Sequence, residues 1–239
     1  MKLSDAGELG EWKRRAEEAE SESLVAKSSA AQAYALFDEE HMKRKKIHNQ
    51  LQDLKGSIRV FARCRPFVGD RENGQESAIE IVDDMTMELD RDGKKTKPFS
   101  FDAIFGGDST QEQVFADCKD LVTSVFDGYN VTVFAYGQTG AGKTHTMYGN
   151  AKQPGLTFRT MEALFHQKEV MEKKEWKVNF KVYFVELYCE KLVDLLNAKG
   201  AAKTDINVKM HAGSGVTVEG VNIMDCKSKA DMEKHLKVR

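Results

Sequence analysis

The 239-residue sequence lacks the features that several classes of protein need. Its four cysteines are widely separated with no C-x-x-C pair, and its six histidines form no H-E-x-x-H motif. We therefore expect no transition-metal site and no disulfide framework, but four incidental thiols. No apolar run approaches the roughly 18 residues of a membrane span. The first ten residues also lack a signal-peptide core, which predicts a soluble, cytoplasmic protein without a membrane partner.

An excess of charge is absent as well. Lys and Arg total 36 against 38 Asp and Glu, which gives a formal net charge of −2. General nucleic-acid binders carry a broad positive excess, so we expect no specific nucleic-acid partner. With 41% hydrophobic and 31% charged residues, the composition predicts a folded chain. The length suits one large domain with an appendage, or two small domains.

Proline is scarce, with three residues in all and none before residue 56. Residues 5–55 are rich in Ala, Glu, Lys, Arg and Gln, which predicts one long helix or two. Spacings of four and three residues define a heptad seam at Ala26, Ala30, Ala33, Phe37, Glu40, Arg44, Ile47, Leu51 and Leu54. The alanines pack weakly and Glu40 and Arg44 interrupt the seam. A coiled-coil dimer and a helix docked on the body are therefore both open.

A basic run, KRKK, lies at residues 43–46 of this helix. A solvated face of a charged helix explains it most simply. An electrostatic contact with an acidic partner is the main alternative, and a nuclear-import signal is a weaker one. Composition does not separate the three interpretations.

After Gly56 the pattern changes to alternating strands and helices. Strand signals are apolar or β-branched runs bounded by turn residues, and helix signals are capping residues followed by a period of 3.6. We expect strands at 58–63, 79–82, 86–89, 131–136, 178–188, 206–209 and 216–223, with a short segment at 192–196. We expect a hairpin turn at 92–93 and helices at 109–126, at 157–173 and from 228 onward. The all-apolar run VTVFAY at 131–136 is typical of a buried central strand.

The segment GQTGAGKT at residues 137–144 fits the phosphate-binding pattern G-x-x-x-x-G-K-[ST]. The candidate phosphate-binding residues are Gly137, Gln138, Thr139, Gly140, Ala141, Gly142, Lys143 and Thr144. The glycines let several backbone N–H groups approach a phosphate, and a following helix adds its positive end. Lys143 is expected to reach the β- and γ-phosphates, and the Thr144 hydroxyl to coordinate Mg²⁺. A nucleoside triphosphate with magnesium is the predicted ligand.

The loop alone does not say whether the chain hydrolyses its ligand. Hydrolysis needs a residue that positions water, a γ-phosphate sensor and an Asp that holds the magnesium. The run VNIMD at 221–225 is a poor match for the magnesium strand, and the D-x-x-G spacing at 90–93 lies upstream, where a plain turn explains it better. We therefore assign no catalytic residue.

A longer string, FAYGQTGAGKTHTMYG at 134–149, resembles that of the kinesin motor domain. Three other segments agree with this family in order and spacing: RVFARCRP at 59–66, FDAIFGGDSTQEQVF at 101–115 and VELYCEKLVDLL at 185–196. The resemblance covers about residues 47–239. It implies an α/β P-loop NTPase fold, with a mostly parallel or mixed sheet that is flanked by helices, is incomplete and follows a long coiled-coil helix. It also implies ATP and Mg²⁺ as ligands. It also implies ATP hydrolysis coupled to movement on microtubules, and a place on the cytoskeleton.

The segment HNQLQDLKGSIRVFARCR at 48–65 places a helical neck directly before the first strand. This order resembles kinesin-14, whose motors follow their stalk and move toward microtubule minus ends. GLTFRTMEALF at 155–165 looks most like the plant and algal calmodulin-binding members, whose calmodulin-binding region lies beyond the motor.

The family resemblance also implies an adenine site. Arg63, Arg65 and Pro66 would flank the base on one side, and His145 would stack from the other. The residue types suit the task, because guanidinium and imidazole planes stack on a purine while Pro supplies a rigid wall. Glu186 and Asp194 look like residues that support the fold.

The sequence departs from the family pattern in one respect. Neither the N-x-x-S-S-R-S-H segment, which senses the γ-phosphate, nor the D-L-A-G-S-E segment, which completes the magnesium site, is present. We interpret residues 1–55 as a neck or stalk helix and 56–239 as the N-terminal portion of a motor that ends before both segments. By the family's sheet order the central sheet would not close normally, and we expect no activity from the chain alone.

Two alternatives to part of a motor stay open. A genuine short product could act without catalysis, using its coiled coil to pair with full-length kinesins. Another P-loop enzyme, such as a nucleotide kinase, is disfavoured by the kinesin-like strings on both sides of the loop.

Overall fold

The computed structural model describes residues 4–56, 58–67, 74–91, 94–95, 97–197, 205–211 and 215–236. The chain divides into two compact units, residues 1–60 and 61–239. Among the described residues, no helix is long and apolar enough to cross a membrane. The same residues contain no group of three or more His, Cys, Asp or Glu side chains that could hold a metal ion.

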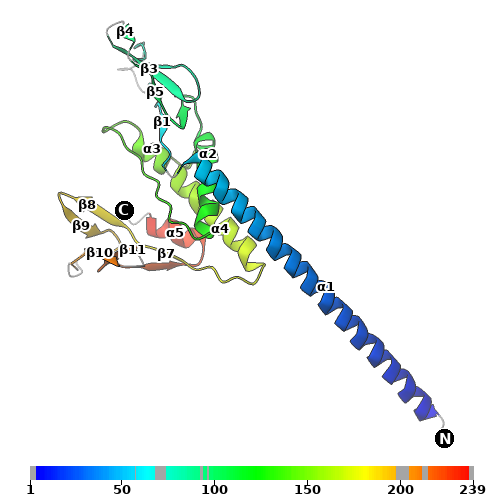
Figure 1. Cartoon of the computed structure of the whole chain (residues 1–239). Coiled ribbons are helices and arrows are strands. Elements are labelled where there is room, and N and C mark those ends of the chain that lie inside the picture. Colours follow the sequence, from blue (N-terminus) through cyan, green and yellow to red (C-terminus); the bar gives the residue numbers. More distant parts are fainter. Residues whose placement is uncertain are drawn as a thin grey trace. The chain divides into compact units, whose positions relative to one another are not determined.

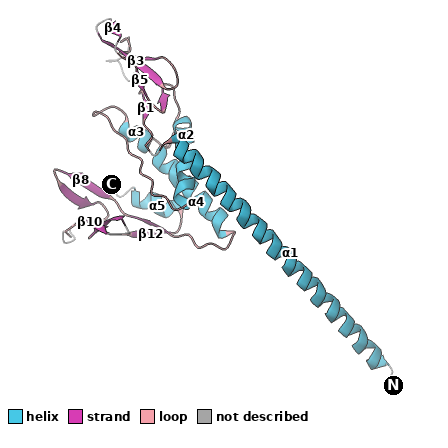
Figure 2. Cartoon of the chain, viewed as in Figure 1, coloured by secondary structure: helices cyan, strands magenta, loops and turns pink. Residues whose placement is uncertain are grey.

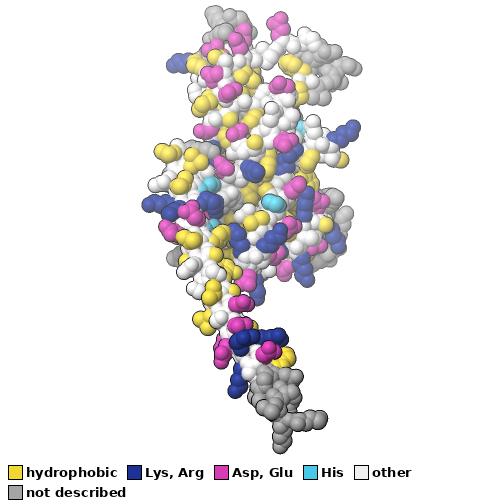
Figure 3. Space-filling model, turned by 90° about the vertical axis from the view of Figure 1, so that its right-hand side faces the viewer, with side chains coloured by type: hydrophobic (Ala, Val, Ile, Leu, Met, Phe, Trp, Pro, Cys, Tyr) yellow, Lys and Arg dark blue, Asp and Glu magenta, His cyan; other side chains and the backbone are white. Residues whose placement is uncertain are grey.

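The first unit is dominated by one helix, α1 (Ser4–Lys55), of 52 residues (Figure 1). The prediction of a long helix is confirmed, as one helix and not two. Figure 3 shows apolar side chains at its surface, interspersed with charged ones. Leu54, at the end of the heptad seam, is 86% exposed. In the basic run, Lys43 Nζ lies 2.9 Å from a carboxylate oxygen of Glu39 and 3.3 Å from one of Glu40, which fits a solvated helix face at this residue.

The second unit contains four helices and twelve strands among its described residues (Figure 2). The helices are α2 (Gln111–Phe126), α3 (Lys143–Met147), α4 (Leu156–Glu172) and α5 (Lys229–Leu236). The strands are β1 (Phe61–Arg63), β2 (Ile79–Ile81), β3 (Thr86–Arg91), β4 (Lys94–Lys95), β5 (Phe99–Ser100), β6 (Ala103–Phe105), β7 (Phe180–Val182), β8 (Val185–Tyr188), β9 (Lys191–Asp194), β10 (Asn207–His211), β11 (Gly215–Glu219) and β12 (Met224–Cys226).

The described strands form five small sheets and not one continuous sheet. Only the β1–β6 pair is parallel, with Phe61 opposite Ala103 and Arg63 opposite Phe105. The pairs β7–β12, β8–β9 and β10–β11 are antiparallel, as are the contacts of β3 with β2, β4 and β5. The predicted pairing of 79–82 with 86–89 is confirmed. The predicted turn at 92–93 lies outside the described residues.

The helices follow their sequence signals closely. At the start of α2, the Thr110 hydroxyl accepts the Gln113 N–H at 3.2 Å and the Gln113 side chain accepts the Thr110 N–H at 2.7 Å, a capping box. Ser228 and Asp231 form the same reciprocal pair before α5. The Ser228 side chain, through its hydrogen bond, holds the pKa of Asp231 below its ordinary value. The predicted helices at 109–126, 157–173 and from 228 are thus confirmed.

The prediction of a buried central strand at 131–136 is wrong for the described structure. These residues carry no strand assignment, and Phe134 and Tyr136 are 79% and 94% exposed. A strand forms only when a neighbour takes up its backbone N–H and C=O groups. No strand of the described residues pairs with this segment.

Three other predicted strands differ most from the observed ones. The run 178–188 splits into β7 and β8, because β7 pairs with β12 while β8 folds back on β9. The strand predicted at 58–63 shortens to Phe61–Arg63, where β6 supplies a partner. The strand predicted at 216–223 ends at Glu219, and β12 begins at Met224 with a different neighbour. In each case pairing sets the ends, which local sequence does not specify.

Two apolar clusters hold the second unit together. The first contains Phe105, Val114, Cys118 and Leu156 and joins β6 to α2 and α4. Val114, Cys118 and Val122 recur every four residues along α2, which places all three on its buried face. The second cluster contains Met161, Cys226, Met232 and Leu236 and joins α4 to α5 and β12. Full burial of each such side chain contributes about 1.5–3 kcal/mol.

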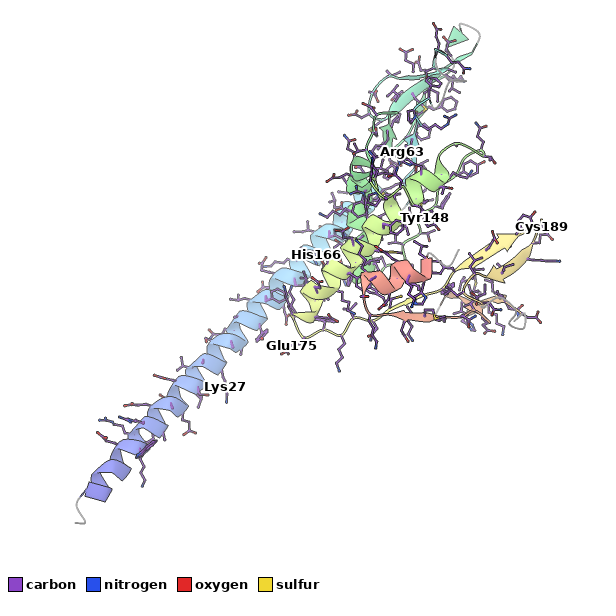
Figure 4. The ribbon with its side chains drawn as sticks, turned by 180° about the vertical axis from the view of Figure 1, so that it is seen from behind. Lys27, Arg63, Tyr148, His166, Glu175 and Cys189 are labelled. Atoms are coloured by element: carbon purple, nitrogen blue, oxygen red, sulfur yellow. The ribbon has the colours of Figure 1, made fainter. Side chains whose placement is uncertain are left out.

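The four thiols differ in accessibility, which predicts an order of labelling. Cys189 is exposed at the tip of the β8–β9 hairpin (Figure 4), whereas Cys118 and Cys226 are buried and Cys64 is half-buried. Burial also raises the pKa of the Cys64 and Cys226 thiols. A higher pKa leaves less of the reactive thiolate at neutral pH. We expect an aromatic disulfide reagent at pH 7.5 to modify one thiol rapidly, and Cys189→Ser to remove that fast phase. A fast phase that survives this substitution would contradict the burial pattern.

Candidate functional site

Residues 137–144 form a tight turn that leads from the segment 131–136 into the first residues of α3. Gly137, Gly140 and Gly142 have φ angles of 151°, 82° and 96°. All three have positive φ angles that side chains disfavour, so the loop conformation favours glycine at the two glycine positions of the phosphate-binding pattern, 137 and 142, and at Gly140 as well. Gly142 is the N-cap of α3, and the helix predicted after the loop is present but has five residues.

The side chain of Lys143 folds back over this loop. Its ammonium donates to the carbonyl oxygens of Gly137 at 2.7 Å and Gln138 at 2.9 Å. Lys143, the one cation among residues 137–144, thus lies against the backbone that is expected to bind a phosphate. Thr144 directly follows Lys143 and is exposed.

Next to the loop lies a pocket of about 280 Å³. It is lined by Arg63, Cys64, Arg65, Pro66, Gly107, Asp108, Ser109, Thr110, Ala141, Gly142, His145, Thr146 and Gln153. The pocket thus brings together all four residues of the expected adenine site with Ala141 and Gly142 of the loop. The other loop residues, Gly137, Gln138, Thr139, Gly140, Lys143 and Thr144, do not line it.

One wall of the pocket is the segment that follows β1. A Cβ added to Gly107 would lie 3.2 Å from Pro66 Cα, so the backbone of Gly107 approaches Pro66 closely. The exposed Arg65 donates from Nη1 to the Pro66 carbonyl at 3.2 Å. Pro66 thus packs closely against Gly107, and both residues line the pocket.

The guanidinium of Arg63 lies at the end of β1 and is held on several sides (Figure 4). Its Nη1 donates to Gln111 Oε1 at 2.8 Å and to Thr146 Oγ1 at 3.0 Å, and its Nη2 to the Ser109 carbonyl at 3.3 Å. Burial lowers the pKa of Arg63 from its ordinary value, although a guanidinium stays charged at neutral pH.

Sequence reasoning missed Gln111, which is only 1% exposed. Besides accepting from Arg63, its amide nitrogen donates to the His145 carbonyl at 2.6 Å. The capping pattern S-T-Q-E-Q places Gln111 in the first turn of α2, but nothing in that pattern tells a buried glutamine from a solvated one. Its burial depends on β1 and α3, which are distant in sequence.

Three aspartates that the sequence analysis considered have structural roles in the described residues. Asp225 of β12 lies 4.0 Å from Lys181 Nζ of β7 in an exposed ion pair. Asp90 belongs to β3, where it pairs in register with Lys95. Asp194 is buried and accepts hydrogen bonds from the backbone of Leu196 and from both nitrogens of Asn222, which fits support of the fold.

The chain is similar in sequence to known proteins. A family model described as the kinesin motor domain matches residues 63–238. Kinesin-like protein KIN-14I of Oryza sativa subsp. japonica is 42% identical over 197 residues, which cover 81% of this chain and 16% of that protein. Kinesin-like protein KIN-14S of Arabidopsis thaliana is 46% identical over 164 residues, covering 66% and 21%. The chain therefore spans only a small part of the length of these relatives.

Solved structures give the same result. The C-terminal motor and motor homology domain of Kar3Vik1, fused to a synthetic heterodimeric coiled coil, superimposes with a TM-score of 0.82 at 28% identity, covering 98% of this chain and 63% of the other. The motor domain of the Kar3-like kinesin from Ashbya gossypii gives a TM-score of 0.65 at 30% identity, covering 76% and 58%. The expected P-loop NTPase fold is confirmed, and the chain covers part of that fold as the solved motors have it. The chain belongs to the kinesin motor domain family, with kinesin-14 proteins among its relatives.

Proposed function

We propose that this chain is the ATP-binding portion of a kinesin-14-type, minus-end-directed microtubule motor driven by ATP hydrolysis. One observation carries the proposal. Three glycines with positive φ shape the loop at 137–144, and Lys143 lies over it beside the pocket that Arg65, Pro66 and His145 line.

The residues of the site fit ATP. Pro66 and Arg65 offer an apolar wall and a planar cation for the base, and His145 offers a second ring. Lys143 exchanges its two carbonyl acceptors for phosphate oxygens, which bind an ammonium more strongly because they are charged. The exposed Thr144 hydroxyl is the protein ligand for Mg²⁺, an ion that commonly takes few protein ligands and its remaining ones from phosphate and water. When bound, Mg²⁺ neutralises charge on the triphosphate.

We assign residues 1–55 to a neck or stalk helix and 56–239 to the N-terminal portion of the motor. The exposed heptad seam of α1 supports this role, because a seam that ends in a side chain as exposed as Leu54 gains stability when a second helix covers it. A short, non-catalytic product that pairs through this helix with full-length kinesins is the second candidate. It would use the same exposed seam of α1. In both cases the partner is a microtubule-associated assembly, and the location is the cytoplasmic cytoskeleton.

The phosphate role of Lys143 is tested by substitution. Lys143→Ala removes the only cation of the loop, and charge-assisted hydrogen bonds contribute about 1.5–3 kcal/mol each. We expect MgATP affinity, measured by titration calorimetry on the 239-residue chain, to fall by about 10- to 100-fold. Lys152→Ala is the matched control, because Lys152 follows α3 in an exposed turn and does not line the pocket. Equal affinity for Lys143→Ala and the unsubstituted chain would remove the assigned role.

Turnover provides a second test. The printed residues contain no γ-phosphate sensor segment and no magnesium Asp segment of the family pattern. We expect the purified 239-residue chain to bind MgATP but to show no ATPase activity that microtubules stimulate, in a phosphate-release assay with a complete kinesin-14 motor as positive control. Stimulated turnover that scales with chain concentration and disappears in Lys143→Ala would refute this expectation.

A further inference from the structure

The most deeply buried polar side chain at the pocket is not one that lines it. Gln111 is 1% exposed, against 7% for Ser124 and 8% for Asp194, the other buried polar side chains of the described residues. It begins α2, directly after the capping residue Thr110. Burying an amide without hydrogen bonds costs several kcal/mol. The hydrogen-bond partners of the Gln111 side chain are therefore what makes its burial favourable.

Both ends of the Gln111 amide are used, and they lead to different parts of the pocket. Its oxygen accepts from Arg63 Nη1 at 2.8 Å, and its nitrogen donates to the His145 carbonyl at 2.6 Å. The orientation of the amide follows from these partners. A flipped amide would point N–H groups at the guanidinium and an oxygen at the carbonyl, and both contacts would then be repulsive.

Arg63 is correspondingly constrained. Its donors reach Gln111, the Thr146 hydroxyl and the Ser109 carbonyl, which belong to the start of α2, to α3 and to the segment before α2. A guanidinium is planar, so three acceptors in different directions fix the plane as well as the position of the group. The face of Arg63 that a flat ligand meets in the pocket is therefore set by its hydrogen-bond partners.

The phosphate loop is held by other contacts. Lys143 bonds to Gly137 and Gln138, and the Ala141 N–H donates to the Gln138 carbonyl at 3.2 Å. Gln111 takes part in none of these bonds. Gln111 reaches α3, the helix that also carries Lys143, at the His145 carbonyl, and it makes no hydrogen bond with the Lys143 ammonium or its two acceptors.

We propose that Gln111 is a positioning residue for the base side of the nucleotide pocket. It fixes the guanidinium plane of Arg63 and the backbone at His145, so that recognition of the purine ring depends on it while binding of the phosphate chain does not. This inference rests on the proposed nucleotide-binding function.

The test compares two ligands in the 239-residue chain. Gln111→Met keeps length and volume but removes both hydrogen bonds. We expect calorimetry to show about a tenfold weaker affinity for MgATP. Affinity for magnesium tripolyphosphate, which has no base, changes by less than about twofold.

Gln111→Glu is the second variant. It keeps an oxygen for Arg63 but has no N–H for the His145 carbonyl, and we expect it to show the same selective loss of MgATP affinity to a smaller degree. This variant carries the test if Gln111→Met does not fold.

Gln113→Met is the matched control, because Gln113 lies two residues further along and its side chain caps α2 without lining the pocket. It lowers thermal stability and leaves the ratio of the two affinities unchanged. Unaltered MgATP affinity in folded Gln111 variants overturns the inference, and so does an equal loss for both ligands, which indicates a purely structural role. Absence of MgATP binding by the unsubstituted chain is a different result, since it refutes the proposed function and the inference together.

Discussion

The arrangement of the pocket depends on how a half-buried arginine is satisfied. Arg63 retains its charge away from bulk water, so its donors need acceptors close by. Those acceptors come from Gln111, Thr146 and the Ser109 carbonyl, and each bond ties the end of β1 to a neighbouring segment. The apolar cluster that joins β6, α2 and α4 buries Phe105, Val114, Cys118 and Leu156 in the same unit. Hydrogen bonds then set the orientation of groups that packing alone would leave free.

The helices and the loop could be predicted from sequence because their determinants are local. A helix satisfies its backbone within the segment, and a capping box such as that of Thr110 and Gln113 marks its start. The loop needs glycines where φ is positive, and the sequence has them at Gly137, Gly140 and Gly142. The residues of the expected adenine site also meet in one pocket, although that expectation came from family resemblance and not from physical reasoning.

The errors have a common physical origin. A strand depends on partners that its own residues do not specify. For this reason the apolar run at 131–136 predicts a central strand that is not there, and the run at 178–188 predicts one strand where the structure has two. The first has no strand partner among the described residues, and the second divides between β12 and β9. Gln111 was missed for a related reason, because its burial is created by segments that lie 34 and 48 residues away in sequence.

Exposed apolar side chains fit the proposal that this chain forms part of a larger assembly. Phe134 and Tyr136 precede the phosphate loop, and Leu54 ends the heptad seam of α1. Adjacent large apolar side chains at such exposure favour contact with another surface. A second helix over the seam would remove Leu54 from water, as the proposed neck role requires.

The central claim is that the loop at 137–144 and the pocket beside it form one nucleotide site. Hydrogen–deuterium exchange of the 239-residue chain with and without MgATP tests it most directly. The account predicts slower exchange on MgATP addition at residues 137–147 and at 63–67, with no change in the β10–β11 hairpin. Unchanged exchange at the loop under conditions where MgATP binds, or protection confined to other segments, would contradict it.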